Sequence, residues 1–235
     1  MSELGLDRLL DALIRPRRAF EALRATPTWA AAFVALVVMT AVNSGFLVER
    51  TDFVEVTREA ATQSGREIDP QQIELVAGVQ ERFGALTSTL SVGVALFAVA
   101  LVLWVATKMV GGEGSYRQLL AGTLHGLLPW FVAMLLSLPG ILRQERFGFA
   151  DYLGVGFFPA TLPTSLAGLA PEGAAPALLT VLSSLDLFSL WSVVLLAVGL
   201  AAITRIPVFR AAATVTALWA VYVLGKVGWV LVGTA

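Results

Sequence analysis

The chain contains no cysteine and only one histidine among its 235 residues. The lack of cysteine excludes disulfides, thiolate metal sites, cysteine nucleophiles and lipid anchors that attach to cysteine. Charged residues make up only 14% of the chain, apolar residues make up 57%, and the mean hydropathy is +0.79. A soluble domain needs a more polar surface than this, so the composition predicts an integral membrane protein.

Familiar catalytic motifs are also missing. The chain has no HExxH helix, no GxSxG elbow and no second intramembrane aspartate to share a proton with Asp186. Metalloprotease, serine hydrolase and aspartyl protease chemistry therefore lack their required residues. The glycine-rich stretch 111–115 lacks the lysine and the spacing of a phosphate-binding loop. The net charge of -1 comes without a long basic run, so nucleic acid is not an expected partner. We therefore expect a protein that is not an enzyme and needs no cofactor or metal.

Five apolar stretches are each long enough to cross a bilayer, which takes about 20 residues of helix. They cover residues 27–48, 84–110, 119–142, 177–204 and 208–232. The sequence therefore predicts an all-α, polytopic membrane bundle with five transmembrane helices over 27–235. Residues 1–26 precede this domain as an interfacial amphipathic segment.

The segment 1–26 places leucines and one isoleucine at helical spacing, with charged residues between them, before Pro16 interrupts the pattern. Four arginines then gather just ahead of the first span, at positions 15, 17, 18 and 24. They can meet anionic lipid headgroups, or they can serve only as an orientation signal. Membrane lipids are the first expected partner.

Two long connections differ in character. Residues 49–83 carry eight acids and four arginines, which predicts two surface helices split near 65–70, whereas residues 143–176 are rich in Gly, Pro, Phe and Leu and are expected at the interface. Lys and Arg outside the spans number nine on the N-terminal side and six on the other. The positive-inside rule thus favours a cytoplasmic N-terminus and an exported C-terminus.

Ionisable residues inside a span are costly and mark candidate sites. Asp186 in the fourth span and Lys226 in the fifth would lie at similar depth in the outer leaflet, and we predict that they pair. Asn43, Ser183 and Ser189 fall in the same layer. This polar cluster is either an outward-facing hydrated cavity for a headgroup, an ion or a peptide, or a packing feature that fixes the register of the helices.

His125, one turn before Pro129 in the third span, is a weaker candidate. Without a second metal ligand or a nearby carboxylate, it indicates helix packing more than proton relay or catalysis.

Several landmarks occur in an order typical of one family. They are Pro16 with Phe20, Pro27 with Trp29, the stretch 111–116 (Gly-Gly-Glu-Gly-Ser-Tyr) and Pro129 in the third span. Over nearly its whole length the chain resembles the Yip family (Ypt-interacting proteins), which are five-span membrane proteins with a large bacterial branch. Eukaryotic members are implicated in vesicle traffic and contact prenylated Rab GTPases. They also carry a long cytosolic N-terminal region. The corresponding region of this chain is short, so the resemblance does not extend the role in vesicle traffic to it.

Two functions stay open. One is a non-enzymatic scaffold of the bacterial cytoplasmic membrane that organises lipids, other membrane proteins or further copies of itself. The other is a small transporter or channel-like protein that uses the polar cluster around Asp186 and Lys226.

Overall fold

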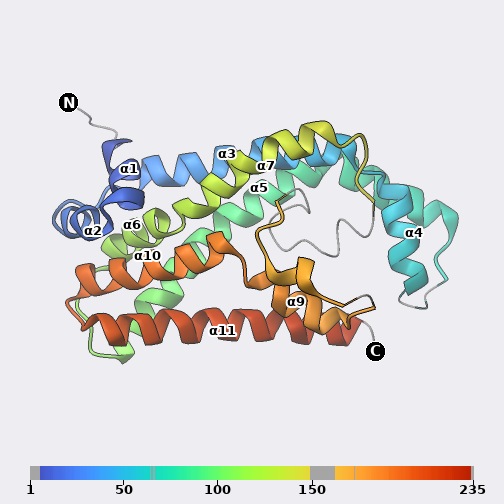
Figure 1. Cartoon of the computed structure of the whole chain (residues 1–235). Coiled ribbons are helices and arrows are strands. Elements are labelled where there is room, and N and C mark those ends of the chain that lie inside the picture. Colours follow the sequence, from blue (N-terminus) through green and yellow to red (C-terminus); the bar gives the residue numbers. More distant parts are fainter. Residues whose placement is uncertain (1–5, 64, 66, 149–161, 172, 234–235) are drawn as a thin grey trace. The chain divides into compact units, whose positions relative to one another are not determined.

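The structure is a computed structural model that describes residues 6–63, 65, 67–148, 162–171 and 173–233. In chain order its helices are α1 (Leu6–Ile14), α2 (Pro16–Ala25), α3 (Ala30–Arg50), α4 (Phe53–Gln63), α5 (Pro70–Met109), α6 (Tyr116–Gly126), α7 (Leu128–Arg143), the 3-10 helix η1 (Leu166–Leu169), α9 (Pro176–Ser184), α10 (Leu187–Thr204) and α11 (Val208–Gly233) (Figure 1). Among the described residues, five helical stretches are long and apolar enough to cross a membrane: α3, α5, α6 with α7, α10 and α11. The predicted all-α membrane bundle is therefore confirmed.

The chain divides into two compact units that alternate along the sequence. Unit 1 comprises Met1–Val38, Ser91–Val132 and Phe188–Val221, and unit 2 comprises Met39–Leu90, Ala133–Leu187 and Tyr222–Ala235. Helices α3, α5, α7 and α11 each contribute residues to both units, and α10 contributes its first residue, Leu187, to unit 2 and the rest to unit 1.

Unit 1 has an apolar core in which α2, α5, α6, α10 and α11 meet. Its buried members include Phe20 and Leu23 of α2, Leu119 of α6, and Leu200 and Ile203 of α10. The short helices α1 and α2 pack on each other and on α6. The amphipathic segment is thus docked on the membrane helices of this unit rather than detached from them.

In unit 2, α3 and α5 lie against each other, and α9 packs on η1. Residues that follow α3 and α7 also meet here: the backbone amide of Phe147 donates to the carbonyl of Arg50 at 2.8 Å, and Arg146 pairs with Asp52 at 3.3 Å. The expected interfacial loop 143–176 lies partly outside the described residues.

The second crossing helix is much longer than expected. The predicted break after α4 is present, but α5 begins at Pro70 and continues without interruption to Met109. Proline is favoured in the first turn of a helix, where no amide hydrogen is needed, so Pro70 starts this helix at the end of the polar loop. The second of the two expected surface helices is therefore the first part of α5.

The other two differences are helix breaks inside expected spans. In the third span α6 ends at Gly126 and α7 starts at Leu128, because Pro129 cannot donate the hydrogen bond that would continue the ladder. The backbone amide of Leu127 compensates by donating to the carbonyls of His125 and Thr123. In the fourth span the expected single helix over 177–204 is two helices, α9 and α10, with Leu185 and Asp186 between them.

Candidate functional site

Asp186 occupies the break between α9 and α10 and is 6% exposed. The chain on either side of it is held by a short antiparallel bridge: the amide of Leu166 donates to the carbonyl of Leu185, and the amide of Leu187 donates to the carbonyl of Thr164, both at 3.2 Å. Aspartate directly before the first residue of a helix is in the preferred N-cap position. The carboxylate is therefore at a helix terminus and not inside a continuous span.

Lys226 of α11 reaches the end of α9. Its Nζ donates to Ser184 Oγ at 3.1 Å, and the same hydroxyl donates back to the carbonyl of Thr180 at 2.8 Å. The ammonium also lies 5.8 Å from the ring centre of Tyr222, one turn earlier on α11. Asp186 is near enough to act electrostatically on Lys226. An ion pair between the two stays a prediction, and Ser184 is a partner that the sequence reasoning missed.

The other serines of the predicted cluster have different surroundings. Ser183 donates to the carbonyl of Thr180 within its own helix, at 3.0 Å. Ser189 is half-buried in the first turn of α10 and belongs to unit 1, whereas Asp186 belongs to unit 2. Of the predicted residues, unit 2 therefore contains Asp186, Lys226, Ser183 and Asn43.

Asn43 joins α3 to α7 within unit 2. Its Oδ1 accepts from Ser137 Oγ at 2.9 Å, and its Nδ2 donates to the carbonyl of Met39 at 3.0 Å. Ser137 is completely buried, and nearby Thr40 Oγ1 lies 3.7 Å from the sulfur of Met134. Interhelical bonds of this kind fix the register of two helices in lipid. Sequence reasoning missed Ser137, although a polar residue in the middle of an apolar stretch was a usable signal.

His125 is buried in unit 1, on α6. Its Nδ1 is 2.8 Å from the carbonyl of Ala121, and its Nε2 has no hydrogen-bond partner among the described residues. Nor do the described residues contain a group of three or more His, Cys, Asp or Glu side chains that could hold a metal ion. The geometry gives His125 a local backbone partner.

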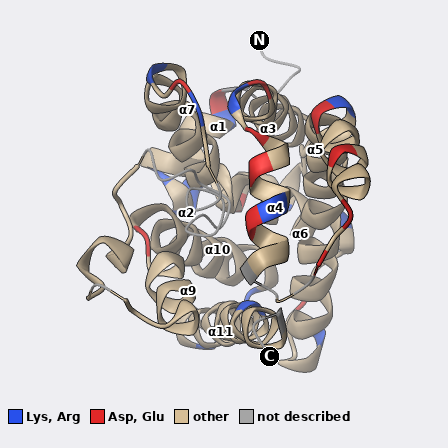
Figure 2. Ribbon diagram, turned by 90° about the vertical axis from the view of Figure 1, so that its right-hand side faces the viewer, with Lys and Arg blue, Asp and Glu red and all other residues tan. Residues whose placement is uncertain are grey.

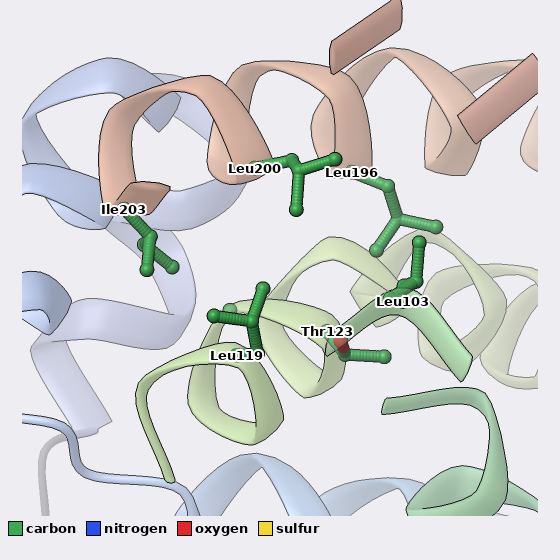
Figure 3. A pocket seen from close by; sticks show the side chains of 7 residues that line it. Leu103, Leu119, Thr123, Leu196, Leu200 and Ile203 are labelled. Carbon is green, nitrogen blue, oxygen red and sulfur yellow. The ribbon is translucent and has the colours of Figure 1, made fainter. Parts of the chain in front are cut away.

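The cavity shown in Figure 3 is in unit 1 and is small. Leu196, Leu200 and Ile203 of α10 face Leu103 of α5 and Leu119 of α6. The space between them is about 10 Å³, hardly enough for one water molecule, and its lining is almost wholly apolar. This cavity is a packing gap between helices rather than a binding site.

A second candidate site is the docked N-terminal segment of unit 1. Phe20 is fully buried and its ring fills the space beside Gly199 of α10, where an added Cβ would come within 2.9 Å of it. Gln118 Nε2 of α6 donates to the carbonyl of Arg24 at 2.7 Å. Arg8 of α1 donates to the carbonyl and the hydroxyl of Thr26 at 2.6 and 2.7 Å. Apolar and polar contacts together hold α1 and α2 in place.

The outer face of this segment is basic and apolar. Arg15, Arg17 and Arg18 are exposed, and the exposed fractions of Leu10 and Ile14 are 64% and 73%. Arg17 also pairs with an acid one turn later on α2, at 3.2 Å. An exposed mixture of arginine and large aliphatic side chains suits the headgroup region of a membrane.

The glycine-rich stretch 111–116 packs in the same unit. Gly111 and Gly114 have φ angles of 78° and 114°, which favour glycine, so the stretch makes the turn between α5 and α6. Ser115 then caps α6 in a capping box with Gln118. Tyr116 Oη donates to the carbonyl of Phe97 at 3.1 Å, and the same phenylalanine ring meets Trp29 edge-on. The glycine-rich turn, Tyr116 and Trp29, which the sequence analysis singled out, therefore lie close together in unit 1.

Comparison with known proteins gives two matches. A family model described as the Yip1 domain matches residues 10–230 of the chain. Membrane protein YknW of Bacillus subtilis (strain 168) is 31% identical over 196 residues, which cover 82% of this chain and 76% of the Bacillus protein. No solved structure matches.

Proposed function

From the premise that this chain belongs to the Yip1 domain family of membrane proteins, we propose that it is a non-enzymatic scaffold that organises lipids or partner proteins at the membrane surface. The observation that carries the proposal is the docked segment α1–α2. Its inner face is fixed to the membrane helices of unit 1, and its outer face offers arginine and aliphatic side chains.

Rigid docking matters because a free amphipathic segment loses conformational entropy when it binds a surface. In this chain, Phe20 and the bond from Gln118 to Arg24 have already ordered the segment. The arginines are therefore already positioned, and their attraction to anionic headgroups is not reduced by the entropy cost of ordering the segment. Each basic residue near an anionic surface contributes about 1 kcal/mol, so three contribute about 3 kcal/mol.

We further propose that the N-terminus lies in the cytoplasm of a bacterium and the C-terminus on the exported side. This orientation is supported by the nine basic residues on the N-terminal side, against six on the other side, four of which are diluted by the acids of the long loop.

The lipid part of the proposal is tested with the full chain in nanodiscs that mix phosphatidylglycerol with phosphatidylethanolamine. The triple variant Arg15→Gln, Arg17→Gln, Arg18→Gln should lose roughly a hundredfold in its preference for phosphatidylglycerol, because about 3 kcal/mol corresponds to about two decades. Native mass spectrometry of the retained lipids measures this preference.

A matched control replaces three arginines of unit 2 that are exposed outside the segment: Arg58→Gln, Arg82→Gln, Arg143→Gln. It should keep the preference of the unmodified protein. If both triple variants behave alike, the arginines of α1–α2 do not recruit anionic lipid.

Transport is the second candidate function, and one observation favours it. The break at Asp186 puts the ends of α9 and α10 beside a buried carboxylate, with Lys226 bonded to the last residue of α9. Transporters use such discontinuous helices to build ion and substrate sites. This function requires Asp186 to be open to water, whereas the scaffold requires no water path.

A further inference from the structure

The first part of α5 continues past the end of α3. A Cβ added at Gly84 of α5 would lie 3.2 Å from the side chain of Val48 of α3. The hydroxyl of Ser44 on α3 donates to that of Ser88 on α5 at 3.1 Å, so the two helices are side by side at this level. Helix α3 ends two residues beyond Val48, at Arg50. Residues 70–83 of α5 therefore extend beyond the apolar part of α3, over roughly 20 Å at 1.5 Å per residue.

This extension is apolar along one line of its surface. Val76, Val79, Phe83, Leu86 and Leu90 follow one another at alternating intervals of three and four residues, which is the a and d pattern of a coiled coil. All five belong to unit 2 and are between 46% and 60% exposed. We call these five residues the α5 seam. In lipid, Leu86 and Leu90 need no protein partner, but Val76 and Val79 lie in the extension 70–83, which also carries charged and amide side chains.

The acids lie away from the seam, whereas Arg82 stands beside it at heptad position g. Glu74 and Glu81 stand at heptad position f, on the far side of the helix, and Gln80 stands at position e. Two copies of this helix could therefore meet along the seam without acids directly opposite each other. The pattern is self-complementary, as a two-fold interface requires.

Charge argues against a lipid surface as the occupant. Residues 53–83 contain six acids and three arginines, and Figure 2 shows the charges on α4 and the start of α5. A net negative segment is repelled by anionic headgroups. The seam therefore needs a protein partner, unlike the basic face of α1–α2.

We propose that the α5 seam pairs with the same seam of a second copy of this chain, as a parallel coiled coil that starts outside the membrane and continues into it. The bilayer holds two copies parallel and at one height, so α5 meets α5 in register without further contacts. This interface is separate from lipid binding by α1–α2 and goes beyond the scaffold proposal.

Single cysteines test the pairing, because the chain has none of its own. Val79→Cys places a thiol on the seam, and Glu81→Cys places one on the opposite side of the same helix; both side chains are exposed, so neither substitution disturbs a core. Under mild oxidation in intact membranes, the full chain with Val79→Cys should form a disulfide-linked product of twice the chain mass. Glu81→Cys should not.

A second variant tests the seam without a crosslink. Val76→Lys with Val79→Lys should abolish resonance energy transfer between differently labelled copies, while Glu81→Lys should leave it unchanged. Equal crosslinking at positions 79 and 81, no crosslinking at 79, or a product whose mass shows a different protein would each overturn the pairing of two copies.

Discussion

Replacement of Phe20 by alanine should release the N-terminal segment from unit 1. The ring is fully buried and fills the space beside Gly199, so the variant loses both its apolar contacts and the filling of that space. Loss of a buried phenylalanine costs about 3–5 kcal/mol in a well-packed core. The released segment can rest on the bilayer, which recovers part of this cost, so we expect a value near 3 kcal/mol.

The rate of thiol labelling at a buried position of α2 measures this loss of free energy. A cysteine at Ala19, which is buried on the same helix, reacts only when α2 opens, so its labelling rate follows the open fraction. Since 1.4 kcal/mol is a factor of ten, Phe20→Ala should raise this rate about a hundredfold. A cysteine at the exposed Ala22 should react at the same high rate in both backgrounds.

Leu10→Ala is the matched control, because it also shortens a large side chain of the segment but on the exposed face. It should leave the labelling rate at position 19 unchanged. If Phe20→Ala and Leu10→Ala label position 19 equally fast, Phe20 does not hold the segment in place.

Three further predictions concern the helix contacts. Asn43→Ala and Ser137→Ala, measured singly and together by unfolding in mixed micelles, should show a coupling of about 0.6–1.7 kcal/mol, and additive effects would mean that their bond contributes nothing. Gly126→Val should lower the melting temperature, because even a Cβ at this position comes within 2.6 Å of Leu196, and an unchanged melting temperature would contradict this close packing. Lys226→Met removes the bond to Ser184 at the end of α9 and should lower the melting temperature, and an unchanged melting temperature would mean that this bond does not stabilise the fold.

Hydropathy predicted five crossings because bilayer thickness sets their length, and the described part of the chain contains five helical stretches that are long and apolar enough. It could not predict where α5 begins, since a hydropathy pattern reports the part in lipid and not the polar turns that the helix adds outside it. Pro70 was a usable start signal, but only the structure shows that the helix continues from there without a break.

The helix break at Asp186 was only weakly indicated by the sequence. Ser183 and Ser184 bond back to the carbonyl of Thr180, and aspartate prefers an N-cap, so the local sequence favours a stop and a new start. The apolar length of 177–204 outweighed these signals in the sequence prediction. The pairing with residues 164–166 depends on a distant part of the chain and could not be predicted.

The polar residues of the candidate cluster were easier to recognise in the sequence than their hydrogen-bond partners. Asn43 and Lys226 were recognisable because burial of such groups in lipid is costly. Their partners, Ser137 and Ser184, follow from which helix faces pack together, which a single sequence does not specify. The family resemblance, drawn from landmarks such as Phe20 and Pro129, is confirmed.

The most direct measurement for the proposed function is the accessibility of position 186 in intact cells. Single cysteines at Arg58, Arg117 and Asp186 are treated with a membrane-impermeant maleimide, with and without permeabilisation. We expect external labelling at position 58, labelling at 117 only after permeabilisation, and none at 186, where the side chain is 6% exposed. External labelling at 186 as fast as at 58 would contradict a sealed break between α9 and α10, show that a water path reaches it, and favour transport over the scaffold.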